Sequence, residues 1–199
     1  MAVTRERFES AMTYDQYKQQ MTRNRERLQQ NEREVVVSPG DLAAFQRLPR
    51  PLNVLVLAED WCGDVIANVP VLGRLAQESG KLNVRVFLRD QNLDLMDQFL
   101  KEGKYRSIPV FAFFDEEFAE VGRFVERPEN VTQLRNQKRR ELHAQHPEYG
   151  SPETPIDQLS EEARAGLMQW MATLREELKP GQDQAVIRDL RAIVERAQQ

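Results

Sequence analysis

Cys62 is the one candidate nucleophile in this chain, which contains no second cysteine. It stands in the segment Trp61-Cys62-Gly63-Asp64, directly after an apolar run and directly before a helical pattern. A thiol in the first turn of a helix lies close to free backbone N–H groups, and their partial positive charge favours the reactive thiolate. The spacing therefore predicts a nucleophilic thiol at a turn between a strand and a helix.

Two elements must position this thiol. The run from Leu52 to Ala58 is nearly all apolar, as expected for a strand that is buried on both faces of a sheet. After Cys62, apolar residues recur at steps of three and four up to Gly80, which is a typical helix end. The residues of this apolar stripe are Val65, Ile66, Val69, Leu72, Leu75 and Ala76.

The charges near Cys62 in sequence disfavour the thiolate form of its side chain. Glu59, Asp60 and Asp64 are close in sequence, and no Lys, Arg or His lies within five residues. A helix N-terminus supplies about 0.3–1 kcal/mol, whereas a change of one pKa unit corresponds to about 1.36 kcal/mol. We therefore expect a moderately activated thiol, with Arg106 as the first candidate for a positive partner.

The segment Trp61-Cys62-Gly63-Asp64-Val65 resembles the Trp-Cys-Gly-Pro-Cys signature of thioredoxin-like proteins. Three further landmarks follow in family order. Pro70 matches the proline that kinks the family's active-site helix, Pro109 matches its cis-proline, and Gly122 matches a glycine of its last strand. The resemblance covers residues 35–136 and implies a thioredoxin fold with a redox-active centre.

The chain departs from this pattern at positions that matter for the reaction. Val65 replaces the second cysteine, Asp64 replaces the proline between the cysteines, and Val56 stands where the family often has a buried aspartate. Without a second cysteine, a mixed disulfide persists until an outside thiol attacks it. The resemblance thus implies a monothiol thiol–disulfide oxidoreductase with Cys62 as the nucleophile. The alternative is a binding or chaperone-like module that has lost redox activity.

In either case we expect a substrate groove around the sulfur. The residues expected to shape it are Trp61, Gly63, Asp64, Ile108 and Pro109. Trp61 would form a partly exposed platform beside the thiol. A carboxylate at a helix start, such as Asp64, caps N–H groups more often than it shuttles protons. Pro109 would restrict the backbone opposite Cys62 and leave neighbouring backbone groups free for an extended substrate.

The expected fold is a three-layer α/β thioredoxin fold, in which a central mixed sheet has helices on both faces. A strand at 84–88 should lie parallel to the strand before Cys62, and strands at 110–114 and 118–125 should form an antiparallel hairpin. Residues 1–34 are predicted as an N-terminal helical arm, which includes one long helix from Thr13, and residues 35–142 as the thioredoxin-like domain. Residues 143–199 are predicted as a linker and a C-terminal helical pair, packed on the domain or on a partner subunit.

The composition of the chain limits the partners, the location and the ligands that we expect. The chain has 199 residues and a net charge of −4, which does not favour binding to nucleic acid or to an anionic membrane. The single cysteine, the polar N-terminus and the lack of a membrane-length apolar run indicate the cytoplasm. We expect thiols and disulfides of proteins or small molecules as partners, and a homodimer is another candidate assembly. No cofactor is expected, and no metal site, because His143 and His146 lack a third ligand nearby.

Overall fold

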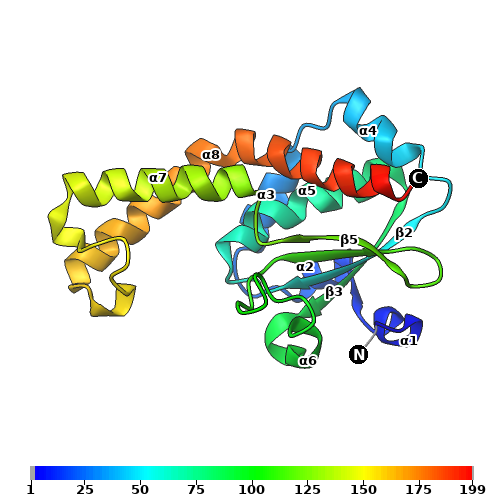
Figure 1. Ribbon diagram of the computed structural model, residues 1–199, viewed down its shortest axis with the longest axis horizontal. Coiled ribbons are helices and arrows are strands. Elements are labelled where there is room, and N and C mark those ends of the chain that lie inside the picture. Colours follow the sequence, from blue (N-terminus) through cyan, green and yellow to red (C-terminus); the bar gives the residue numbers. More distant parts are fainter. Residues whose placement is uncertain (1–2, 199) are drawn as a thin grey trace. The chain divides into compact units, whose positions relative to one another are not determined.

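The protein is described by a computed structural model for residues 3–198 (Figure 1). The chain forms two compact units, described separately below. One extends to Arg127 and resumes at Asp183, and we call it the sheet unit. The other, Pro128–Gln182, is the helical unit. None of the helices formed by residues 3–198 has the length and apolar character needed to cross a membrane.

The sheet unit is built on a mixed sheet of five strands in the order β1-β3-β2-β4-β5. β3 lies parallel to β2, whereas β4 is antiparallel to β2, β5 is antiparallel to β4, and β1 is antiparallel to β3. The parallel pair and the hairpin agree with the prediction. The strands are β1 Met12–Thr13, β2 Leu52–Ala58, β3 Leu82–Leu88, β4 Val110–Phe114 and β5 Glu120–Val125.

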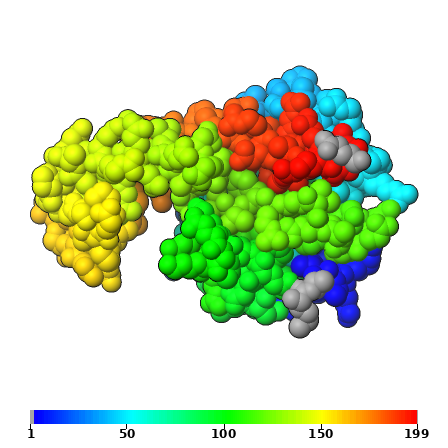
Figure 2. Space-filling view, in the orientation of Figure 1, coloured from blue at the N-terminus to red at the C-terminus, as the bar shows by residue number. Residues whose placement is uncertain are grey.

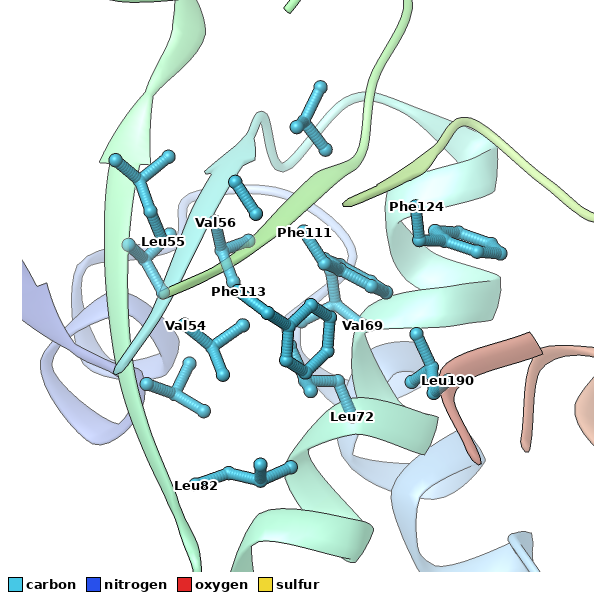
Figure 3. Packing of buried hydrophobic residues seen from close by; sticks show 14 of the residues in the cluster. Val54, Leu55, Val56, Val69, Leu72, Leu82, Phe111, Phe113, Phe124 and Leu190 are labelled. Atoms are coloured by element: carbon cyan, nitrogen blue, oxygen red, sulfur yellow. The ribbon is translucent and has the colours of Figure 1, made fainter. Parts of the chain in front are cut away.

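Helices cover both faces of this sheet. α5 packs on one face together with α3 and α4, and α1 and α6 lie on the opposite side (Figure 1). Figure 3 shows Phe111 and Phe113 of β4 pointing toward Val69 and Leu72 of α5. These helices are α1 Arg5–Glu9, α2 Tyr14–Gln20, α3 Arg25–Glu34, α4 Pro39–Gln46, α5 Gly63–Ser79 and α6 Leu93–Met96.

The N-terminal arm differs from its prediction because the segment predicted as one long helix from Thr13 forms two helices, α2 and α3. The capping box of Thr13 and Gln16 starts α2 as predicted. The chain leaves the helical conformation at Met21, and the next helix begins at Arg25, after the N-cap residue Asn24, which has a left-handed backbone with φ 55°. Tyr17 and Leu28 are completely buried. The arm is therefore part of the core of the sheet unit.

Two other predicted elements are absent or shorter in the described residues. The apolar run Val35-Val36-Val37, whose composition is typical of a strand, has no ladder partner, and Val36 is exposed. Residues 92–103, whose apolar spacing predicts a helix that starts after Asn92 and ends at Gly103, form the single turn α6 with irregular chain after it. Apolar residues at 99 and 100 extend the helical pattern, but the chain makes only isolated turns there.

The predicted C-terminal helical pair is wrong, because α8 is one helix, Glu161–Arg196, that continues through Pro180. A proline removes one backbone hydrogen bond and costs about 3 kcal/mol in a helix interior. Burial of apolar side chains on both sides of Pro180 outweighs that cost, at about 1.5–3 kcal/mol for each large residue. Leu167 is buried in the helical unit, and Leu190 is buried in the sheet unit.

Gly122 of β5 shows why the end of α8 can pack on the sheet unit. A Cβ atom at this position would lie 3.1 Å from a methyl carbon of Ile193. In Figure 2 the end of α8, in red, lies directly beside the neighbouring strand, in lime. The glycine landmark found in the sequence therefore allows a close approach between a helix and the sheet.

The helical unit consists of α7, Glu129–Gln145, two short 3₁₀ turns, and the first part of α8. His143 is buried here, and its Nδ1 lies 2.8 Å from the carbonyl oxygen of Gly150. The spacing of His143 and His146 next to Pro147 predicts a solvated loop pair, and the burial of His143 within α7 contradicts this for that residue. The buried apolar core of this unit is Leu142, Leu159, Ala163 and Leu167.

Candidate functional site

Cys62 is the N-cap residue of α5 and follows the end of β2 through a short turn. Its backbone N–H donates to the Glu59 carbonyl, and its own carbonyl accepts from Ile66, the first bond of the helix. The side chain is half-buried, and Sγ lies 3.6 Å from the carbonyl oxygen of Ile108. The structure thus brings together the thiol and the proline loop, which are 46 residues apart in sequence.

The surroundings of the thiol do not favour ionisation. Burial raises the pKa of Cys62 above its ordinary value, and the carboxylate of Asp64 raises it further. The backbone N–H groups of Val65 and Asp64 and the guanidinium of Arg127 lower it, but they do not offset burial. This direction is opposite to the moderate activation expected from the helix N-terminus, because the sequence did not show how deeply the sulfur would be buried.

Arg127 provides the positive charge near the thiol, in place of Arg106. The Nε and Nη2 atoms of Arg127 lie 3.2 and 2.6 Å from the two oxygens of Asp64. Arg106 instead forms a two-point ion pair with Asp97 at the surface. Arg127 follows the last strand, 63 residues from Asp64, so no local sequence signal marked it.

Glu126 connects Arg127 to the proline loop. One carboxylate oxygen lies 2.6 Å from Nη2 of Arg127, and the other lies 2.6 Å from Nζ of Lys101. The backbone N–H of Glu126 donates to the Pro109 carbonyl over 2.7 Å, and its carbonyl accepts from the Asn68 amide. Glu126 has φ 65°, a left-handed conformation that is uncommon for a residue other than glycine.

Pro109 follows a cis peptide bond from Ile108. The Pro109 carbonyl is already paired with Glu126, and the Ile108 carbonyl faces the sulfur. Ile108 itself is buried. Of the two carbonyls at this loop, that of Pro109 thus accepts from the Glu126 backbone and that of Ile108 accepts from the Cys62 thiol.

Trp61 is 45% exposed, so it provides apolar surface next to the thiol. The guanidinium carbon of Arg89 lies 4.9 Å from the ring centroid, in cation–π geometry. Arg89 also donates to the Arg106 carbonyl over 3.3 Å. The basic side chain of Arg89 therefore lies over the predicted Trp61 platform, a contact that the sequence did not predict.

The carboxylates of the two acidic residues before Trp61 are fixed by hydrogen bonds within the protein. Burial opposes ionisation of Asp60, but hydrogen bonds from the backbone N–H groups of Thr22 and Arg23 and from the Thr22 hydroxyl lower its pKa. Glu59 is buried, and burial raises its pKa although it accepts a bond from the backbone N–H of Asp90. The two residues near the thiol are therefore not equivalent negative charges, as their sequence positions alone would indicate.

The thioredoxin family profile matches residues 11–141. The chain belongs to the thioredoxin family. A crystal structure of a protein of unknown function from Pseudomonas aeruginosa superposes with a TM-score of 0.70 at 21% identity, covering 99% of each chain. An HIV epitope scaffold superposes with a TM-score of 0.68 at 19% identity, covering 98% of each chain. At these identities the two structures show the fold alone. No curated protein sequence matches the chain significantly.

Within this thioredoxin fold, the sequence-predicted site residues share one corner of the sheet unit. Cys62 and Ile108 are in direct contact, and Gly63 is the first helical residue after the thiol. Asp64 lies in the first turn of α5, where the helix dipole favours a carboxylate, and Arg127 pairs with it.

Proposed function

We propose that this thioredoxin-family protein is a monothiol thiol–disulfide oxidoreductase with Cys62 as its nucleophile. The observation that carries the proposal is the half-buried Sγ at the start of α5, 3.6 Å from the Ile108 carbonyl beside Pro109. Backbone N–H groups of Asp64 and Val65 stabilise negative charge on this sulfur. The position that would hold a resolving cysteine is Val65, which is completely buried.

The reaction has three exchange steps. The Cys62 thiol gives up its proton, and its sulfur attacks one sulfur of a substrate disulfide. The S–S bond breaks, a Cys62–substrate mixed disulfide forms, and the released thiolate takes up a proton. An external thiol then attacks the Cys62 sulfur, forms a disulfide with it and releases the second half of the substrate as a thiol. A further external thiol regenerates Cys62, so two external thiols are oxidised for each substrate disulfide reduced.

We further propose disulfides of proteins or small molecules as substrates, and a cytoplasmic location where small thiols are abundant. The exposed face of Trp61 and the Ile108 carbonyl suit an extended chain that carries the reacting sulfur. The raised pKa of Cys62 implies slow attack at neutral pH, because only the thiolate is nucleophilic.

The second candidate function is a binding module that uses the same groove without redox turnover. One observation favours it, since burial raises the pKa of the only thiol. Under this alternative, Trp61 and the proline loop bind an extended segment while Cys62 stays reduced.

Intact-mass analysis after incubation with glutathione disulfide separates the two functions. We expect a single adduct on the native protein that dithiothreitol removes, and none on the Cys62→Ser variant. In the Val65→Cys variant the second thiol should resolve the adduct, leaving an intramolecular disulfide. A native protein that stays unmodified, although its urea-unfolded form reacts, would support the binding module. Rapid reduction of a protein disulfide without an external thiol would contradict the monothiol cycle.

A further inference from the structure

The ion pair between Asp64 and Arg127 is much more buried than the two-point pair that Arg106 forms with Asp97 at the surface. The side chains of Asp64 and Arg127 are only 13% and 17% exposed, and both guanidinium contacts go to separate carboxylate oxygens. Such two-point contacts fix the relative orientation of the two groups. Asp64 lies two residues after Cys62, in the same first turn of α5.

We propose that Arg127 is a positioning residue that sets the nucleophilicity of Cys62 by holding and neutralising the Asp64 carboxylate. This inference deepens the proposed function, and only its biological use rests on that function. Arg127 is itself oriented by Glu126, whose other oxygen binds Lys101 and whose backbone N–H holds the Pro109 carbonyl. One ion-pair chain thus links the charge beside the sulfur to the loop opposite it.

The titratable groups that face the sulfur come from three parts of the sheet unit. Asp64 acts on it from α5, Arg127 from the segment after β5, and Tyr17 from α2. Tyr17 is neutral at physiological pH, because burial and the nearby carboxylates raise its pKa. Asp64 and Arg127 therefore form the opposed charged pair, and each screens the effect of the other on the thiol.

Removal of Asp64 and removal of Arg127 should change the reactivity of the Cys62 thiol in opposite directions. Asp64→Asn removes the carboxylate with little change in shape and leaves the positive Arg127 in place, held by Glu126. Arg127→Gln leaves a negative carboxylate beside the sulfur. At neutral pH we expect about three- to tenfold faster alkylation of Cys62 in the first variant and a comparable slowing in the second.

The experiment is the pH profile of Cys62 alkylation by iodoacetamide in the native protein, the two single variants and the double variant. The double variant should return close to the native rate, because both opposed charges are gone. Arg127→Lys keeps the charge but cannot make the two-point contact, so it should fall between the native protein and Arg127→Gln. Asp97→Asn and Arg106→Gln, which break the exposed two-point pair, are the matched controls and should leave the profile unchanged.

Shifts of the same sign in both single variants, or no shift in Asp64→Asn, would overturn the proposal. If Arg127→Gln fails to fold, Asp64→Asn and Arg127→Lys still show whether removal of each charge speeds or slows the alkylation of Cys62. Alkylation does not require disulfide exchange. A protein that forms no glutathione adduct yet shows the opposite shifts would contradict the proposed function and support this inference.

Discussion

The sheet unit and the helical unit are stabilised to different degrees by apolar burial. In the sheet unit, strands β2 and β4 bury every residue except Asn53, and their side chains join those of α5 and the end of α8 in one continuous core. In the helical unit the buried apolar core has four members, with aromatic and aliphatic side chains partly buried around it. The free energy of burial grows with apolar area, so the two units should differ in resistance to opening.

This difference bears on function because the candidate site lies entirely in the better-packed unit. The neighbours of Cys62 along α5, Val65 and Ile66, belong to the core of the sheet unit, as does Ile108. The distance between the sulfur and the proline loop is thus set by buried residues. A thiol whose reactivity depends on a few ångströms of geometry needs such a support.

The largest expected effect comes from removing a ring at the centre of the sheet unit. Phe113 is completely buried and lies opposite Val54 in the β2–β4 ladder. We expect Phe113→Ala to lower the free energy of unfolding by about 3–5 kcal/mol, because a large cavity replaces the ring. Urea denaturation followed by near-UV circular dichroism measures this change. A loss below about 1 kcal/mol would contradict the view that this core dominates stability.

A corresponding change in the helical unit should have a smaller and more local effect. Leu167 is completely buried, and Leu167→Ala should cost about 2–4 kcal/mol locally. Hydrogen exchange should show faster exchange in residues 128–182, with protection around Cys62 retained. Met168→Ala, at an exposed position of the same helix, is the control. Equal loss of protection in both units would show that they unfold as one.

A polar group inside the sheet unit, the carboxylate of Asp60, provides a further test of how this unit is stabilised. Asp60 accepts three hydrogen bonds from Thr22 and Arg23, and Asp60→Asn should cost about 1–2 kcal/mol at pH 7. The pKa of Asp60 is lower in the folded than in the unfolded protein. Its contribution is therefore full above the unfolded pKa, near 4, and is lost as the pH falls through the folded pKa.

Denaturation of the native protein and the Asp60→Asn variant from pH 7 to pH 2.5 tests this linkage. The difference in stability should shrink as the pH decreases. A difference that stays constant with pH would mean that the hydrogen bonds depend on shape alone and not on the charge of the carboxylate.

The smallest expected effect concerns Tyr17 of α2. Its hydroxyl is buried and has no hydrogen-bond partner among the described residues. Tyr17→Phe removes this unpaired group, so stability should stay the same or rise by up to about 1 kcal/mol. Thermal unfolding measures the change. A clear loss of stability would show that the hydroxyl has a partner, such as a buried water.

Much of the sheet unit was predictable because its elements have strong local patterns. The apolar run of β2, the helical stripe of α5 ended by Gly80, and the hairpin of β4 and β5 were each predicted. Predictions failed where neighbouring patterns merged or where tertiary contacts overrode propensity. The arm from Thr13 broke into two helices at Asn24, and α8 continued through Pro180. In both places burial of separate apolar groups decided the path of the chain.

The candidate site shows the same division between features that local sequence predicts and features that tertiary contacts decide. The position of Cys62 at a helix start follows from adjacent residues, and the proline loop was found from its resemblance to a known family. Arg127 and Glu126 were missed because Asp64 and Lys101, with which they form ion pairs, lie 63 and 25 residues away in sequence. The direction of the thiol pKa was missed for a related reason, since burial depends on what packs over the sulfur.

The order of the apolar patterns along the chain, with one cysteine between the central strand and the helix after it, determined the fold and the place of the thiol. The tertiary structure alone decided which charges face that thiol and how far water is excluded from it. Local patterns act through hydrogen bonds and apolar periodicity over a few residues, whereas electrostatic effects depend on distance and burial in three dimensions. This is why Arg127 and Asp64, 63 residues apart, form the ion pair beside Cys62.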